Sequence, residues 1–238
     1  TRHLRIIVAM SLSTALRIAQ SGIAFNQSAL RTISHNVANV NTPGFSRQEV
    51  VASTQNFQGV SAGVSSGEVI RKVSNTLLNR LSQQQAVVGF TQARTEFMQT
   101  LEVAFGKPGS SVSIEKIVNR MFNDLQAVVN NPEFASLRQN FVLSAELLTD
   151  NVRALDQELL DTQFAADSAI DQDIAAINEA LKKVYELNTQ IRELSLGPAG
   201  SGIGDLQDER QLQIDVIASR LKVSTTRGEN GEVYLTSE

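Results

Sequence analysis

Side chains able to do acid–base or metal chemistry are few in this chain and form no catalytic pattern. Cysteine is absent, which excludes thiol nucleophiles, disulfides and cysteine-ligated metals. Histidine occurs only as His3, close to the first residue, and as His35 on a predicted helix. Because one isolated His35 cannot complete a Ser-His-Asp triad or a metal-ligand set, we interpret it as a polar helix residue.

Acidic residues and a glycine-rich segment are the remaining candidates for ligand binding. Four aspartates share a predicted helix: Asp161, Asp167, Asp171 and Asp173. We interpret them as a solvated face rather than a cation site. Segment 197–204 lacks the preceding strand and the following Lys-Ser/Thr of a phosphate-binding loop, so it is predicted to be a flexible loop between helices. We therefore expect no catalytic, cofactor-binding or metal-binding residues, and no enzyme activity.

Composition points to slender helices rather than to a broad core with a pocket. Only 5% of the 238 residues are aromatic and none is Trp, so aliphatic and alanine contacts must dominate the packing. The net charge is −4 and the basic residues are scattered, which argues against nucleic-acid binding. No apolar run approaches the ~18 residues of a membrane span, and no cleavable signal peptide is recognisable.

A heptad pattern marks the first predicted helix. From Leu16 onward, the pattern advances in alternating steps of three and four residues, with Asn26 filling one position. We call the following eight residues the seam: Leu16, Ala19, Ile23, Asn26, Leu30, Ile33, Val37 and Val40. The repeat predicts coiled-coil packing, and Asn26 is the kind of polar residue that fixes its register.

A second apolar set lies on this helix away from the seam. It consists of Met10, Ala15, Ile18, Gly22, Phe25 and Ala29. One neighbour cannot cover two apolar faces, and the chain offers few partners nearby. We therefore expect several partners to cover the helix; the alternative is a helix buried within its own domain.

The segment 41–44 ends the helix. Pro43 lacks the N–H that would continue it and pushes Thr42 into an extended conformation, while Gly44 permits positive φ. The following residues are rich in Val, Ser and Gly, and alternation at Gln48–Val50 and Glu68–Ile70 predicts short strands or extended arms.

Helices resume near Ser74 and are interrupted at 106–109. Ser113 is then expected to cap a helix that runs to Asn130. Between Pro132 and Leu194 no further Pro or Gly occurs, which predicts a single helix of ~60 residues, about 90 Å long.

A further helix is predicted over 205–221, and 223–236 should form a hairpin whose turn contains Asn230–Gly231. Because two isolated strands are marginally stable in water, we infer that the chain is a piece of a longer protein.

The predicted fold class is mainly α: an elongated helical bundle or coiled coil with a short extended β arm and the beginning of a β-rich domain. Residues before Met10 look unlike those that follow, and we expect them to be a non-native leader. Five segments result: leader 1–9, coiled-coil helix and turn 10–45, extended connector 46–73, long-helix bundle 74–221, and the start of a truncated β domain 222–238.

The sequence from Asn36 to Gln48 (NVANVNTPGFSRQ) is an unusually elaborate helix stop. Its asparagines can hydrogen-bond backbone groups as the helix unwinds, and Phe45 can anchor the exiting chain. Following a heptad helix and a candidate start methionine, it closely resembles the N-terminal signature of bacterial flagellar axial proteins, which form the rod, hook and hook-associated parts. We call these residues the signature turn: Asn36, Asn39, Asn41, Thr42, Pro43, Gly44, Phe45 and Arg47.

Other segments resemble the hook-associated branch that forms the first junction between hook and filament. Ser46–Gln48 is similar to that branch's ending, and 59–71 followed by 77–81 resembles its extended arm and next helix. Residues Asp205–Leu212 resemble a Leu-Asp-Gln-Arg-Asp-type motif, although their order is shuffled here.

The resemblance implies a structural protein of the flagellum, outside the cell at the hook–filament junction. Implied partners are identical subunits in a ring or tube, the hook protein, the next hook-associated junction protein, an export chaperone and the flagellar type III export apparatus. Neither nucleic acid nor membrane is among them, and export would need no cleaved signal. The alternatives are another axial protein of the hook or rod, and a coiled-coil secreted protein unrelated to flagella.

Overall fold

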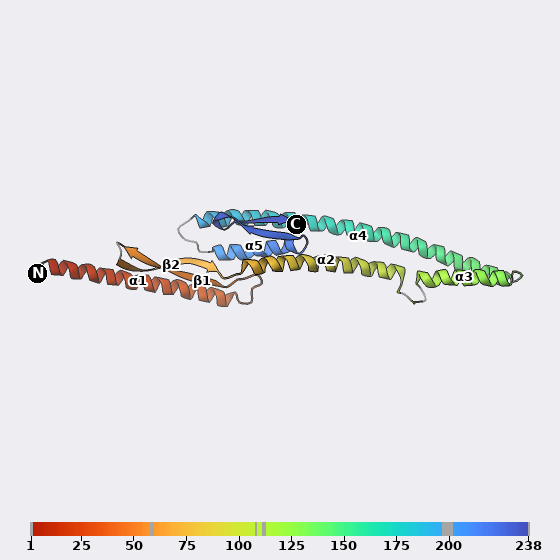
Figure 1. The fold of residues 1–238 in the computed structure, drawn as a ribbon, viewed down its shortest axis with the longest axis horizontal. Helices are drawn as coiled ribbons and strands as arrows, with labels where there is room; N and C mark the ends of the chain where they lie inside the picture. The colour runs from red at the N-terminus through yellow and green to blue at the C-terminus, as the bar shows by residue number, and fades with distance from the viewer. Residues whose placement is uncertain (1, 58–59, 108, 111–112, 197–201, 238) are drawn as a thin grey trace. The chain divides into compact units, whose positions relative to one another are not determined.

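The computed structural model describes residues 2–57, 60–107, 109–110, 113–196 and 202–237. Over these residues the elements follow the order α1 (Arg2–Ala38), β1 (Gln48–Phe57), β2 (Val60–Arg71), α2 (Asn75–Phe105), α3 (Ile114–Asn130), α4 (Ala135–Ser195), α5 (Ile203–Ala218), β3 (Val223–Arg227), the 3-10 turn η1 (Glu229–Gly231) and β4 (Val233–Ser237) (Figure 1). The predicted mainly α class is confirmed.

The chain divides into two compact units, one of residues 1–87 with 177–238 and the other of residues 88–176. The described helices include none with the length and apolar character required for crossing a membrane.

In the first unit, helix α1 has the β1–β2 hairpin along one of its faces (Figure 1). Ser21 Oγ accepts a hydrogen bond from the backbone N–H of Val64, at 3.1 Å. The approach is so close that a Cβ on Gly63, whose φ is +120°, would overlap the Ser21 hydroxyl. On the same side of α1, Phe25 and Ala29 are half-buried. The hairpin therefore partners the second apolar face around Phe25 and Ala29, whereas Ile18 on the same face stays 39% exposed.

The hairpin itself is longer than expected. Its strands have 10 and 12 residues and pair antiparallel, with Gln48 opposite Arg71 and Val50 opposite Val69. The two segments singled out by their alternation are therefore each other's partners. Helix α1 begins at Arg2, so it continues through the residues that were expected to form a distinct leader.

The second unit contains the later part of α2, all of α3 and the first part of α4. Ser113 caps α3 as predicted, its hydroxyl accepting from the N–H of Lys116 at 3.4 Å. A short turn around Pro132 reverses the chain into α4, which runs unbroken for 61 residues, also as predicted. Residues from 177 onward in α4 belong to the first unit. The expected loop 197–204 lies mostly outside the described residues.

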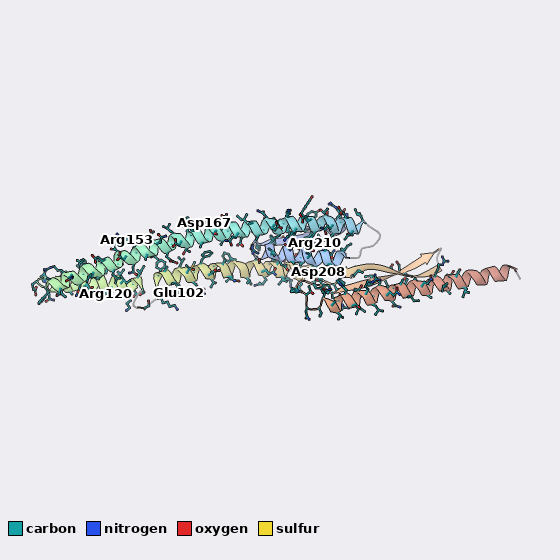
Figure 2. The ribbon with its side chains drawn as sticks, turned by 180° about the vertical axis from the view of Figure 1, so that it is seen from behind. Glu102, Arg120, Arg153, Asp167, Asp208 and Arg210 are labelled. Atoms are coloured by element: carbon teal, nitrogen blue, oxygen red, sulfur yellow. The ribbon has the colours of Figure 1, made fainter. Side chains whose placement is uncertain are left out.

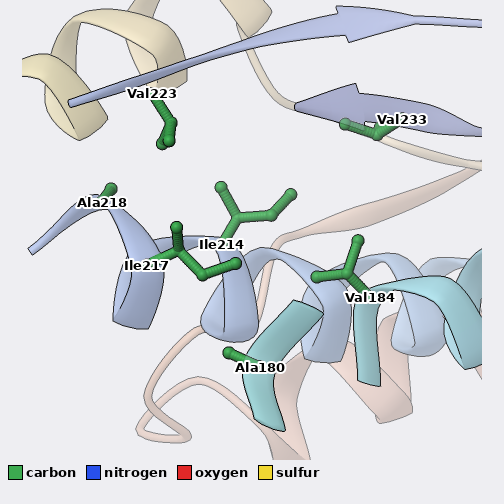
Figure 3. Packing of buried hydrophobic residues seen from close by; sticks show 7 residues of the cluster. All are labelled: Ala180, Val184, Ile214, Ile217, Ala218, Val223 and Val233. Carbon is green, nitrogen blue, oxygen red and sulfur yellow. The ribbon is translucent and has the colours of Figure 1, made fainter. Parts of the chain in front are cut away.

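The core of the first unit lies where α4 and α5 meet the β3–β4 hairpin (Figure 3). Its buried residues are Ala180, Val184, Ile214, Ile217, Ala218, Val223 and Val233. The predicted hairpin is confirmed, and its turn places Asn230 at φ +58° and Gly231 at φ +81°. The expectation of an isolated hairpin is wrong, because Val223 and Val233 pack against the two helices.

Replacing Ile217 with Ala should lower the free energy of unfolding by about 2–5 kcal/mol, because Ile217 is 1% exposed and its loss leaves a cavity. Urea unfolding followed by circular dichroism measures the change. The control is Val216→Ala, the exposed neighbour on the same helix, which should cost well under half as much. Equal losses for the two variants would contradict the packing of this core.

Candidate assembly site

The seam faces solvent along its whole length, from Leu16 to Val40. All eight residues are exposed, and its large apolar members range from 56% exposed for Ile33 to 73% for Val40. Single exposed apolar residues are common on proteins, but a continuous heptad stripe marks an interaction surface. The chain covers the other apolar face of α1 with its hairpin and leaves this one open.

At the end of α1, Asn36 fixes the direction in which the chain returns. Its side-chain amide donates to the carbonyl of Gln48 at 2.8 Å and accepts from the N–H of Gln48 at 2.9 Å. The side chain thus pairs with the first residue of β1 as a neighbouring strand would. The side chain bonds backbone groups, as expected of the asparagines at this helix end, and these groups belong to the strand that follows.

Asn39 hydrogen-bonds the backbone within the helix end itself. Its amide donates to the carbonyl of His35 at 3.1 Å, and its Oδ1 accepts from the hydroxyl of Thr42 at 3.2 Å. Phe45 packs edge-on against the His35 ring, with centroids 5.3 Å apart, which anchors the exiting chain to the helix. Asn41, Pro43 and Arg47 are exposed.

Helix α5 supplies the opposite wall of the turn. Asp205 accepts from the side chain of Gln48 at 2.6 Å and lies 3.0 Å from Nε2 of His35. Asp208, one helical turn later, accepts from the N–H of Ser46 at 2.8 Å. His35 is therefore a partnered polar residue, and a contact between residues 170 positions apart joins α1 to α5. We call this set of contacts between residues 35–48 and α5 the junction.

A buried ion pair lies at the centre of the junction. Nε of Arg71, at the end of β2, is 2.5 Å from Oδ1 of Asp208, and the two side chains are 6% and 8% exposed. Burial lowers the pKa of Arg71 below its ordinary value, and the attraction of Asp208 opposes that shift. Arg71 also donates to the hydroxyl of Ser46 at 3.2 Å. Figure 2 shows Asp208 on α5.

Gly44 closes the turn against α5. Its φ is +81°, and a Cβ there would lie 2.6 Å from a methyl group of Leu212. Between the turn and α5 remains a shallow hollow of about 230 Å³, lined by His35, Phe45 and Leu212 among others. Glycine is therefore required by both the backbone conformation and the close approach.

The junction joins His35, Ser46 and Gln48, which lie beside the signature-turn residues, to partners that sequence reasoning did not select. Of the signature-turn residues, Gly44 approaches α5 most closely, at Leu212. Asp205, Asp208 and Leu212 were noted only for a motif resemblance, and Arg71 only as part of an extended arm. The spacing of the first three, i, i+3 and i+7, places them on one helix face, and this was the available signal. The arrangement positions α1 against α5.

The acidic residues of α4 do not gather into a site. Asp161, Asp167, Asp171 and Asp173 are all exposed, and Figure 2 shows Asp167 on α4. Among the residues that the structure describes, no three His, Asp or Glu side chains are grouped closely enough to hold a metal ion.

Two family models match the chain. The one described as the flagellar hook-associated protein FlgK helical domain covers residues 98–238, and one described as the flagella basal body rod protein covers residues 16–45. The second match spans nearly all of the seam and the signature turn.

Several curated relatives are similar over most of the chain. Flagellar hook-associated protein 1 of Salmonella typhimurium is 27% identical over 230 residues, which is 94% of this chain and 41% of the relative. The protein of the same name from Bacillus subtilis is 24% identical over 236 residues, covering 93% and 46%. Flagellar hook protein FlgE of Caulobacter vibrioides is 33% identical over 129 residues, covering 52% and 20%. The chain thus spans less than half the length of these relatives.

Replacing Asp208 with Asn should destabilise the first unit by about 3–5 kcal/mol, because the buried guanidinium of Arg71 loses its counter-charge. Denaturant unfolding measures the loss. Glu49→Gln serves as the matched control, since the Glu49–Lys72 pair is about half-exposed and should contribute about 1 kcal/mol or less. Similar effects of the two substitutions would rule out a buried pair at the junction.

Replacing Gly44 with Ala should cost about 1–2 kcal/mol for its backbone conformation, and more for the overlap with Leu212. A double-mutant cycle with Leu212→Ala separates the two costs, because the shorter side chain relieves only the overlap. A coupling free energy of zero would show that Gly44 does not approach Leu212.

Proposed function

We propose that this chain, which belongs to the flagellar hook-associated protein FlgK helical domain family, is part of a structural subunit that joins hook to filament. The observation that carries the proposal is the exposed seam of α1, an apolar surface suited to packing against another helix. The same chain matches the family model of a flagellar hook-associated protein. The role is mechanical, and lateral helix packing performs it.

The seam supplies the energy of assembly. Leu16, Ile23 and Leu30 are each about 60% exposed, and covering such surface yields roughly 25 cal/mol per Å² of apolar area. Asn26 fixes the register in which a partner helix can lie. The junction holds α1 in a set direction relative to α5, so that each subunit presents its seam in the same orientation.

The partners follow from this role. Identical subunits would pack side by side in a ring or tube, which requires a head-to-tail interface whose rotation closes. The hook protein and the next hook-associated junction protein would lie at either end. An export chaperone and the flagellar type III apparatus would deliver the chain to the cell exterior without a cleaved signal. We also propose 10–45, 46–73, 74–221 and 222–238 as functional segments of the chain, which do not coincide with its two compact units.

The alternative of a rod or hook protein has less support. The rod-protein match lies within residues 16–45, where rod, hook and hook-associated proteins share a signature, so it does not distinguish among them. The match over residues 98–238 does distinguish them, because it is specific to the helical domain of hook-associated proteins.

Replacing Ile23 and Leu30 together with Asp should abolish incorporation into flagella, because two carboxylates would enter the apolar contact. Immunoblotting of sheared flagella and a motility assay measure this loss. Thermal unfolding of the isolated chain should be unchanged within about 1 kcal/mol, since both side chains are exposed.

The control is Ala24→Asp, an exposed position on the same helix outside the seam, which should assemble normally. Normal motility of the Ile23→Asp/Leu30→Asp variant would contradict the proposed role of the seam.

A further inference from the structure

A second hollow, of about 310 Å³, lies on the side of α5 that the junction does not use. Its walls come from the end of β2, the first turns of α2, helix α5 and the strands β3 and β4. Three arginines line it, Arg71, Arg210 and Arg227, and none of the lining residues is acidic. Figure 2 shows Arg210 on α5, near Asp208.

The positive charges of this hollow are incompletely balanced. Arg71 has Asp208 as its partner, whereas Arg210 is 4% exposed and donates only to neutral oxygens, Oδ1 of Asn188 at 2.7 Å and the carbonyl of Gly231 at 2.8 Å. Within the described part of the chain, neither Arg210 nor Arg227 forms an ion pair.

Neighbouring charges reinforce this imbalance. The pKa of Arg210 is lowered to about 10, first by burial and then by repulsion from Arg227 and Arg71. The other carboxylate nearby, Asp215, accepts from Gln211 at 3.0 Å, and burial raises its pKa. Both nearby carboxylates, Asp208 and Asp215, therefore act on Arg71, and the more deeply buried Arg210 has none.

We propose that this hollow binds one small oxyanion, of the phosphate, sulfate or carboxylate type, between Arg210 and Arg227. A buried cation is stable only when it is paired and hydrogen-bonded, and a bound anion completes what the chain leaves open. The planar guanidinium matches the geometry of such oxyanions. Because the walls come from β2, α2, α5, β3 and β4, the bound anion would link the β3–β4 hairpin to α2 and α5.

Arg210 also holds the hairpin through Asn188 and Gly231, so its removal would unsettle the fold with or without an anion. Arg227 separates the two roles. It is exposed, lies on β3, and lines the hollow. Arg227→Gln therefore removes charge from the site while leaving the fold intact. Lys182→Gln is the matched control, because this exposed residue of the same unit carries equal charge away from the hollow.

The experiment titrates the wild-type chain and both variants with phosphate, sulfate or acetate, and uses sodium chloride of equal ionic strength as the reference. Thermal unfolding gives the unfolding midpoint, and isothermal titration calorimetry gives the affinity and the number of anions bound. Phosphate and sulfate stabilise most proteins by exclusion from the surface, but that effect does not saturate and all variants share it. For wild type and Lys182→Gln we expect a saturating rise in the unfolding midpoint and binding of one anion per chain. Phosphate against acetate shows which oxyanion class is preferred.

For Arg227→Gln we expect the anion to bind about tenfold more weakly, or weaker still, because the site loses one charge-assisted hydrogen-bonding group. The proposal is overturned if no anion gives saturable binding to wild type, or if Arg227→Gln binds as tightly as Lys182→Gln.

Discussion

One constraint governs the structure: the apolar seam of α1 must be covered, and no other part of the described chain covers it. The helix has two apolar faces, and a single neighbour can cover only one of them. The β1–β2 hairpin covers the face that contains Phe25 and Ala29, which leaves the seam open to solvent. Exposed apolar surface of this length is unfavourable in an isolated molecule and becomes useful when another helix covers it. The hairpin and the junction hold this helix in place and keep its direction fixed.

Two asparagines show how the hairpins are held. The side-chain amide of Asn36 both donates to and accepts from the backbone of Gln48. The amide of Asn188 does the same with Val233, donating to its carbonyl at 2.9 Å and accepting from its N–H at 3.2 Å. In each case, a helix side chain satisfies an edge strand that would otherwise have open backbone groups. Charged residues of α5 then secure both places, Asp208 near the first and Arg210 at the second. One helix, α5, thus contacts the attachment points of both hairpins.

Features with local causes could be predicted from the sequence. The Ser113 cap, the Asn230–Gly231 turn and the unbroken α4 each follow from a few neighbouring residues, and all three are present. The junction could not be predicted, because Asp208 and Ser46 lie 162 residues apart and only folding brings them together. The same reason explains why the cover of the second face of α1 was missed: alternation near Gln48 predicts strands but does not state which helix they will pack against. The exposure of the seam in the isolated chain was foreseen through its heptad spacing, and its occupant in the assembly remains a prediction.

The most direct test of the exposed seam uses the absence of cysteine from the chain. Because the chain has no other thiol, a single introduced Cys reports the solvent exposure of its own position. Leu30→Cys places a thiol on the seam, and its rate of modification by a maleimide can be compared between the isolated chain and intact flagella. The thiol should react rapidly in the isolated chain and be strongly protected in flagella. Protection in the isolated chain, or rapid modification within the flagellum, would contradict the role assigned to α1.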